Sequence, residues 1–504
     1  MRNPFNAIFR KEAKTTPQKS DAVNGKKVPV YPTSSGNVSA FPSAPGSAAG
    51  YEEYTYQPRP RTGFKKVSKI LVMVLSFVIV LLPLAFLLLK GNPFVGKNVE
   101  KKGEITWWVL GMEERVIKKM IEEYQVKNPK AKINLIVQSE VDYRERLVNS
   151  LKEKKGPDVF TIHNSWVPML IDQLDPVPEN VYTKEDYAKD FYPVVVKDMN
   201  TTNGIVGISL EYDALTLFVN ESTFSSSGET PPRTWDQFTP LATKLTIRGA
   251  NNLILQSGAA MGWAENVEYW PEIVGLLMLQ NKSNLYSPAT TNDLSSGAIQ
   301  EFGNFHSVYK VWDETLPKST VAFAEGKAAM VFAPARAASE IKKLNPNLNF
   351  KTVIVPQVRR DDPNEPEYTY ATYWVQSVWN KSGDKDLAWD FLRFLSGENS
   401  LQEMHDTSES LGLLPKAYPR ISMRDKLIND KIFGSIVALA PVASSWYLAD
   451  ATNDGEEGIN SLVNAAYKKV VDLVSMRKGG NNTAVIKALT AELKKVLSGF
   501  NIAN

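Results

Sequence analysis

Between residues 105 and 162, short apolar runs alternate with helix-like patterns, and this alternation restricts the fold more than any other feature of the chain. Runs of this length are typical of buried strands, and the segments between them carry one apolar helical face each. The predicted strands are 105–110, 132–137 and 158–162, and the predicted helices are 115–127 and 143–154. This β-α-β-α-β order predicts a parallel sheet with crossover helices. Helices predicted at 235–244, 269–280 and 298–312 indicate a second α/β unit.

Residues 70–89 form an uncharged apolar run of the length that crosses a bilayer as a helix. No small-residue cleavage site follows it, so we expect an uncleaved anchor rather than a signal peptide. The preceding Pro-, Ser- and Gly-rich stretch buries too little apolar surface to fold and is predicted to be disordered. The predicted parts are a tail (1–66), a membrane helix (67–90), a linker (91–103) and a binding domain (104–504). The basic excess before the helix favours a cytoplasmic tail and an extracellular or periplasmic domain.

The charge balance and the lack of cysteine exclude several function classes. Lys and Arg total 58 against 55 Asp and Glu, so no strongly basic character points to nucleic acid. With no cysteine, the chain has no disulfide, no thiol nucleophile and no cysteine for a lipid anchor. Its three histidines, His163, His306 and His405, are too widely spaced to indicate a metal site. We therefore expect no metal and no cofactor.

Four groups of short motifs follow one another within residues 104–504. They are Ile105-Thr-Trp-Trp108 with Gly156-Pro-Asp-Val159, Leu217-Phe-Val-Asn220 with Pro231-Pro-Arg-Thr-Trp-Asp-Gln-Phe238, Phe323-Ala-Glu-Gly-Lys-Ala-Ala-Met-Val331, and Ala388-Trp-Asp-Phe-Leu-Arg-Phe-Leu395 with Gly412-Leu-Leu-Pro415. In order and spacing they resemble the extracellular solute-binding proteins of ABC transporters, of the maltose-binding type (family 1). The resemblance implies a periplasmic-binding-protein-like fold, in which two α/β lobes joined by hinge strands hold a ligand in the cleft between them.

The same resemblance implies where the lobes and hinges lie. Lobe one is expected at about 104–211 and 359–412, and lobe two at about 215–354 and 415–504. The hinges are expected near 210–213, 355–357 and 412–415. Closure of the cleft on the ligand is the expected motion, with a few hinge residues absorbing the change of angle.

Candidate ligand-binding residues come from two sources. Positions that match the cleft of the family or offer polar groups there are Trp108, Glu140, His163, Asn164, Trp166, Tyr212, Asp213, Trp270, Arg336 and Trp446. Trp263 and Trp374 are added on residue type and loop placement alone. For each of them core packing is the alternative, and Trp235, Trp379 and Trp389 are expected to be core. Aromatic rings cover the apolar face of a sugar, while carboxylates, amides and Arg bind its hydroxyls, so a carbohydrate is the favoured ligand.

One segment departs from the family pattern. Residues 333–337 follow the Ala-Met strand, where the family often has Trp, and they carry Arg336 instead. This puts maltodextrin itself in doubt and leaves an anionic sugar, a phosphate-bearing ligand or another anion open. The alternative for Arg336 is a salt bridge at the hinge or surface.

We therefore expect a membrane-anchored binding protein that captures a small ligand and passes it to the permease subunits of an ABC importer. Two other classes stay open. A sensor or adhesion protein would use the same domain to signal through the membrane helix, although the tail is short for a signalling domain. A glycan hydrolase would need two carboxylates flanking one bond, and no nucleophile elbow, Walker loop or His-Glu-x-x-His motif occurs in the sequence. Reversible binding without catalysis is therefore the favoured reading.

Overall fold

The computed structural model describes residues 101–359, 366–450, 452–476 and 482–502, which belong to one compact unit. The predicted tail, the predicted membrane helix at 67–90 and the linker as far as residue 100 lie outside the described residues. Among the helices that are described, none combines the length and the apolar character needed to span a bilayer.

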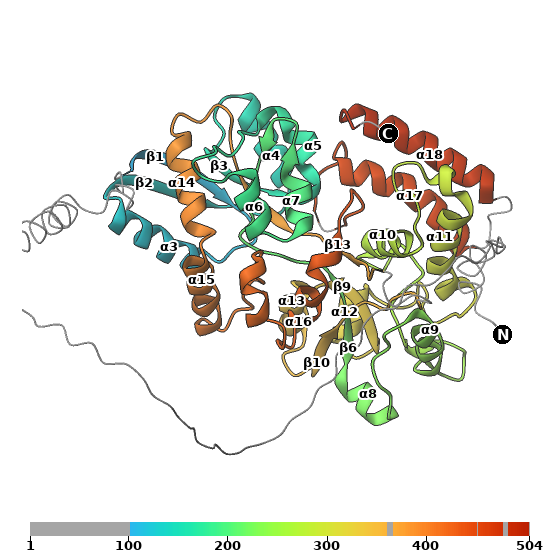
Figure 1. Ribbon diagram of the computed structural model, residues 1–504. Helices are drawn as coiled ribbons and strands as arrows, with labels where there is room; N and C mark the ends of the chain where they lie inside the picture. The colour runs from blue at the N-terminus through green and yellow to red at the C-terminus, as the bar shows by residue number, and fades with distance from the viewer. Residues whose placement is uncertain (1–100, 360–365, 451, 477–481, 503–504) are drawn as a thin grey trace, which may run out of the picture. The chain divides into compact units, whose positions relative to one another are not determined.

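Lobe one is built on a four-stranded sheet in the order β12-β3-β1-β2. Figure 1 labels β1, β2 and β3 of this sheet. Its strands are β1 (Lys102–Val109), β2 (Lys130–Val137), β3 (Val159–His163) and β12 (Trp374–Val378). β1 pairs in parallel with both β2 and β3, which confirms the predicted parallel arrangement, and β12 pairs antiparallel with β3. The helices of this lobe are α3 (Glu114–Lys127), α4 (Tyr143–Lys152), α5 (Val167–Leu170), α6 (Lys184–Asp190), α7 (Pro193–Met199), α14 (Lys385–Leu395) and α15 (Glu398–Ser410).

Alternation along β1 decides which of its two tryptophans is core. Successive side chains of a strand point to opposite faces, and Trp107 is fully buried against Phe391 of α14. Its indole Nε1 donates to Gln376 Oε1 at 2.9 Å, which satisfies the buried N–H. Trp108 faces the other way and is only partly buried. β3 is buried along its whole length because it lies inside the sheet, between β1 and β12.

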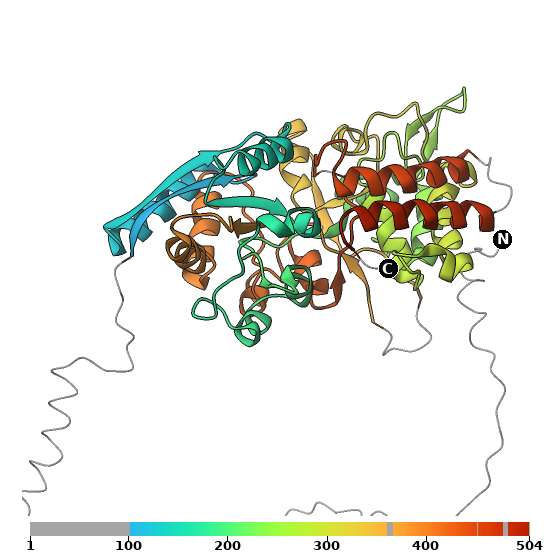
Figure 2. The same cartoon turned by 90° about the horizontal axis from the view of Figure 1, so that it is seen from above.

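Lobe two contains a three-stranded antiparallel sheet in the order β10-β6-β9. Its strands are β6 (Leu215–Asn220), β9 (Met330–Pro334) and β10 (Phe350–Val353). Its helices are α8 (Glu221–Ser227), α9 (Trp235–Lys244), α10 (Trp270–Gln280), α11 (Asn292–Ser307), α12 (Ser319–Ala324), α13 (Ala337–Leu344), α16 (Gly434–Leu439), α17 (Ile459–Ser475) and α18 (Asn482–Gly499). α17 and α18 run side by side in both views and pack on α11 (Figures 1 and 2).

Short two-stranded pairings complete the fold. They are β4 (Asn200–Thr201) with β5 (Gly204–Ile205), β7 (Ile247–Arg248) with β8 (Ile254–Gln256), and β11 (Thr369–Tyr370) with β13 (Ala443–Ser444). The pairing of β11 with β13 is parallel and brings the segment before Trp446 next to the segment before β12.

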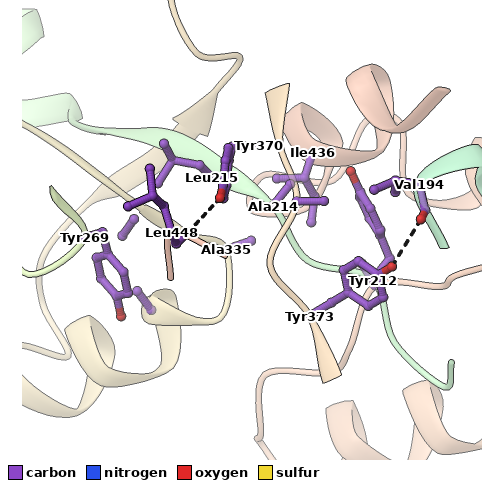
Figure 3. Packing of buried hydrophobic residues seen from close by; sticks show 14 of the residues in the cluster. Val194, Tyr212, Ala214, Leu215, Tyr269, Ala335, Tyr370, Tyr373, Ile436 and Leu448 are labelled. Atoms are coloured by element: carbon purple, nitrogen blue, oxygen red, sulfur yellow. Dashed lines mark hydrogen bonds between the residues drawn. The ribbon is translucent and has the colours of Figure 1, made fainter. Parts of the chain in front are cut away.

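Two extended segments cross between the lobes and run antiparallel to each other. Ile208 bridges Gln376, and Ala214 bridges Ala371, so one segment leads into β6 while the other leads into β12. Figure 3 shows the crossing, where the rings of Tyr212 and Tyr373 pack together at 6.2 Å. Farther along the same segments, Tyr370 donates its hydroxyl to the Leu448 carbonyl at 2.7 Å.

The hinge expected at 355–357 is placed differently. Gln357 bridges Thr234, and the Pro356 carbonyl accepts from Gln280 Nε2, so this segment stays within lobe two. The return crossing lies instead at 371–374. A third connection follows α15, where Ala417 bridges Tyr212.

Candidate functional site

A cavity of about 430 Å³ lies between the two lobes beside the crossing segments. Its walls come from the loops after β1 and β2, the crossing segment 210–213, the start of α13, and α15 with the chain that follows it. Polar and charged side chains of this wall include Glu113, Gln138, Glu140, Glu211, Tyr212, Asp213, Arg336, Ser339, Lys343, His405 and Lys416. Ligand sites of open α/β sheets gather at the carboxyl ends of the strands, and the ends of β1 and β2 open onto this cavity. We call it the hinge cavity.

Asp213 and Arg336 form an ion pair at the wall of the hinge cavity. Asp213 Oδ2 lies 3.1 Å from Arg336 Nη1 and also accepts from the Arg336 amide, while Oδ1 accepts from the amides of Ala214 and Ala335. Arg336 Nη1 donates in addition to the Thr372 carbonyl at 3.0 Å. Burial raises the pKa of the Asp213 carboxyl, and the Arg336 guanidinium acts in the opposite direction. The pair therefore ties both crossing segments to the start of α13.

A second ion pair lies on the same crossing segment. Glu211 Oε2 is 2.8 Å from Lys416 Nζ, and both side chains line the hinge cavity. Sequence reasoning missed Glu211, Lys416 and the nearby His405. Their places in the sequence could have indicated two of them. Glu211 directly precedes the predicted Tyr212, and Lys416 directly follows the Gly412-Leu-Leu-Pro415 motif.

Four of the predicted ligand-binding residues line the hinge cavity: Glu140, Tyr212, Asp213 and Arg336. Glu140 is exposed after β2, so its carboxylate is open to a ligand. Tyr212 is buried, and its ring centre lies 4.9 Å from that of Tyr192. The Tyr212 hydroxyl has no hydrogen-bond partner among the described residues. The structure thus brings together predicted residues from a strand end, the crossing segment and α13.

Two further predicted residues, Asn164 and Trp446, line a different cavity of about 400 Å³ that also has walls from both lobes. Here Asp198 is half-buried and accepts from Asn164 Nδ2 at 2.9 Å, from the Tyr373 hydroxyl and from Ser445 Oγ. Burial raises the pKa of the Asp198 carboxyl, and these hydrogen bonds oppose the shift. Trp446 lies edge-on to Tyr286 at 5.6 Å. This second cavity shares no lining residue with the hinge cavity.

Three predicted residues are packed in the interior: His163, Trp166 and Trp270. His163 contacts Ser165 Oγ through Nδ1 at 2.7 Å and Thr372 Oγ1 through Nε2 at 3.0 Å. Burial, with the Arg336 charge nearby, lowers the pKa of its imidazole well below 6.5, so the ring is neutral at pH 7. Trp166 donates Nε1 to Asn460 Oδ1 at 3.0 Å.

The last three predicted residues, Trp108, Trp263 and Trp374, are half-buried and line neither interlobe cavity. Trp263 stacks on His306 with 4.4 Å between ring centres. Trp374 packs edge-on to both His163 and Trp166, at 5.2 and 5.3 Å. The expectation that Trp235 and Trp389 are core residues is confirmed by their burial.

A larger cavity, of about 1010 Å³, lies away from the crossing segments. It is bordered by the 229–233 loop, α9, β10 and α16, and the crossing-segment residues are absent from its wall. Size alone therefore does not single out the candidate site. We base the assignment on the position between the lobes, where closure can enclose a ligand.

A buried acidic pair lies at the start of α10. Glu272 is fully buried and its Oε1 accepts from the Asp450 amide at 3.0 Å, while Oε2 has no partner among the described residues. Burial and the neighbouring Asp450 carboxyl raise the pKa of Glu272 to about 8. Burial and Glu268 raise the pKa of Asp450 to about 7. The pair therefore holds a proton more tightly than either carboxyl would in water.

The comparisons with known proteins agree with this architecture. The family profile described as bacterial extracellular solute-binding protein matches residues 112–400, more than half of the chain. No curated protein sequence matches.

Solved structures of similar fold include a cyclo/maltodextrin-binding protein complexed with maltotetraose (13% identity, TM-score 0.62, covering 80% of this chain and 99% of that one). They also include the sugar-binding protein MalE of Xanthomonas citri (18%, 0.62, 79% and 98%) and a cyclic alpha-maltosyl-1,6-maltose binding protein of Arthrobacter globiformis (15%, 0.62, 79% and 100%). At these identities the likeness carries the fold, two α/β lobes with crossing segments. Together with the profile match over residues 112–400, it shows that the chain belongs to the bacterial extracellular solute-binding protein family.

Proposed function

We propose that this protein is a membrane-anchored receptor that captures a carbohydrate in the hinge cavity and delivers it to the permease subunits of an ABC importer. The observation that carries the proposal is the position of that cavity, between two lobes joined by crossing segments, in a chain of a solute-binding family. Its volume of about 430 Å³ falls within the range of small-molecule sites. Capture is reversible and breaks no covalent bond.

The polar groups of the hinge cavity suit sugar hydroxyls. Glu140 offers a solvent-open carboxylate, and Ser339 and Gln138 line the same wall. The similar structures were solved with maltotetraose and with other sugars, among them mannotriose and α-D-tagatose, which supports the ligand class. The length of sugar that fits depends on how far the lobes separate.

A neutral sugar is favoured over an anionic one. The positive charge of Arg336 is compensated at 3.1 Å by Asp213, and that of Lys416 at 2.8 Å by Glu211. At these two positions an entering anion therefore meets a cation whose charge is already balanced, whereas Lys343 on the same wall has no ion pair among the described residues. Glu140, which is exposed on the same wall, adds repulsion, whereas Glu113 is paired with Arg115 at 3.0 Å.

The anchor belongs to the same proposal. The apolar run 70–89 would hold the receptor beside its transporter, as a lipid does in proteins with an N-terminal cysteine, which this chain lacks. Membrane fractionation of cells that express the intact chain tests this part. Recovery of the protein in the membrane pellet after washing with alkaline carbonate supports a spanning helix, and recovery in the supernatant contradicts it.

Binding is tested by a thermal-shift screen of the intact protein in detergent against neutral mono- and oligosaccharides, uronic acids, sugar phosphates and amino acids. A ligand that binds only the folded state raises Tm by mass action, by the equivalent of about 2.7 kcal/mol at 100 times its Kd. A shift with maltotetraose or mannotriose, without sugar turnover, supports the receptor. Hydrolysis products would instead favour a glycan hydrolase. A response only to ligands that are not sugars would show that the ligand belongs to another chemical class than the proposed carbohydrates.

Two substitutions locate the ligand. Glu140→Gln removes a carboxylate from the hinge cavity, and we expect affinity to fall about tenfold, the equivalent of one charge-assisted hydrogen bond. Glu122→Gln, on the exposed face of α3, is the matched control and should leave affinity unchanged. If Trp446→Phe lowered affinity while Glu140→Gln did not, the second cavity would be the binding site.

A further inference from the structure

Two asparagines of lobe two reach across to lobe one outside the crossing segments. Asn453 donates Nδ2 to the Glu140 carbonyl at 3.2 Å. Asn460, almost fully buried, accepts from Trp166 Nε1 at 3.0 Å, and its Nδ2 lies 2.8 Å from Ser165 Oγ. Trp166 and Ser165 directly follow β3, so both contacts join the lobes.

The Asn460 amide is held in place from its own lobe. It lies in the first turn of α17, a helix that packs on α11 and α18. The Asp454 carboxylate accepts from the backbone amides of Asn460 and Ser461, which fixes the start of this helix. Nδ2 also donates to the Tyr447 carbonyl at 2.9 Å. The side chain therefore presents its oxygen to lobe one without free rotation.

Asn453 acts on the side of the hinge cavity. The carbonyl that it binds belongs to Glu140, whose side chain lines that cavity. Two residues on, Gly455 lies so close to lobe one that a Cβ there would meet Glu145 Oε1 at 1.5 Å. A rotation that separates the lobes at the hinge cavity must break the Asn453 contact.

We propose that Asn453 and Asn460 form an interlobe clasp, acting as positioning residues that hold the lobes in the closed arrangement and set the rate at which ligand leaves. Crossing segments that act as a hinge permit rotation, so contacts outside them can decide how long the lobes stay closed. Interlobe hydrogen bonds add a free-energy difference between closed and open forms, and they do so without touching the ligand. The influence on ligand release rests on the proposed receptor function, whereas the influence on the lobes does not.

The clasp is tested first without ligand. Because the chain has no cysteine, Glu122→Cys on α3 and Lys494→Cys on α18 give two exposed labelling positions, one on each lobe, in the intact protein. Single-molecule energy transfer then reports the interlobe distance.

Asn453 has a positive φ of 47°, so Asn453→Gly removes the amide without backbone strain. Asn460→Ala removes the second amide and places a good helix former in the first turn of α17. Asn464→Ala is the control, because its Nδ2 binds the Ala449 carbonyl within lobe two.

We expect Asn453→Gly and Asn460→Ala each to raise the population at longer interlobe distance by roughly three- to tenfold, and Asn464→Ala to leave it unchanged. An unchanged distribution in Asn453→Gly overturns the clasp, and this exposed position keeps the test valid if Asn460→Ala fails to fold. A second readout uses maltotetraose as probe in stopped-flow tryptophan fluorescence. Faster dissociation in the two clasp variants at equal association rate supports the role in retention. Absence of any maltotetraose signal counts against the sugar receptor but leaves the distance result as it stands.

Discussion

Asp213 and Arg336 show how the charge of a buried carboxylate is compensated inside a protein. Burial disfavours the charge, but Asp213 accepts four hydrogen bonds, two of them from Arg336. All four donors lie on the crossing segment itself or at the start of α13. Asp213, which the sequence predicts to contact the ligand, therefore also connects the crossing segment to the start of α13.

Arg336→Met tests this fastening. It leaves Asp213 buried without its counter-ion, so we expect a loss of about 2–4 kcal/mol in the free energy of unfolding in urea. Lys416→Met is the comparison, because the Lys416 side chain is 34% exposed and water screens its pair with Glu211. We expect it to cost less than about 1 kcal/mol. Equal losses in the two variants would contradict a special role for Arg336.

Glu272→Gln tests the buried acid at the start of α10. The pKa of Glu272 rises from 4.5 to about 8 in the folded protein. The folded state therefore binds a proton more tightly than the unfolded state, and stability falls as the pH rises from about 4.5 to about 8. Glutamine cannot ionise, so the variant should lose less stability over this range, by an amount on the order of a few kcal/mol. Urea unfolding at pH 5 and pH 8.5 measures the difference, and parallel pH profiles would contradict the prediction.

Residue type alone could not sort the tryptophans. Trp166 and Trp446 both follow strands and both carry an indole N–H, yet one is core and the other lines a cavity. A large ring serves a core and a sugar platform equally well. The partner that makes Trp166 structural is Asn460, far along the chain, and one sequence does not reveal such a pairing.

At the scale of elements, β1, α3, β2, α4 and β3 were predictable because each is short and bounded by turn signals. Their observed bounds differ from the prediction by at most a few residues. α11 was predicted at 298–312 and runs over Asn292–Ser307. The predicted helix ran too far because the apolar residues Val311 and Trp312 continue the helical pattern. Both are in fact buried in a loop, where Trp312 Nε1 donates to Asn266 Oδ1 at 2.6 Å.

One glycine of α10, Gly275, lies where the fold leaves no room for a larger side chain. Gly275 faces Tyr370, and a Cβ there would approach the ring at 2.5 Å. Gly→Ala in a helix interior ordinarily stabilises by about 1 kcal/mol. Here Tyr370 is fully buried and bound to the Leu448 carbonyl, so the ring cannot move away freely. We expect Gly275→Ala to cost about 1–3 kcal/mol by thermal or urea unfolding. Gly499→Ala at the end of α18, with nothing within 4 Å of its Cβ, is the control and should be neutral or slightly stabilising.

At the scale of the whole molecule, the two-lobed plan was predictable from the order of the motifs, but the path of the chain between lobes was not. The strand β12 joins β3 although more than 200 residues separate Trp374 from His163. The antiparallel sheet of lobe two also left no signal in the order of its elements. Long-range pairing is decided by packing partners, which periodicity does not encode.

This interleaving predicts cooperative unfolding. Lobe one is assembled from two distant stretches of the chain, and lobe two contributes Asn460 to its packing. Neither lobe is a continuous segment that can fold while the other is absent. We therefore expect a single transition in calorimetry of the intact protein. Two transitions, each abolished by a different lobe variant, would show that the lobes unfold separately.

The place where β1 begins has a consequence for how such a receptor searches. β1 starts at Lys102, and the proposed membrane helix ends at Lys90. The stretch between Lys90 and Lys102 reaches roughly 40 Å when fully extended. Each copy would thus remain in a thin layer above the bilayer, where its effective concentration at an importer is fixed by tether length. If the anchor is as proposed, a captured molecule would meet its transporter through lateral diffusion in two dimensions, and copies would not be lost to the medium.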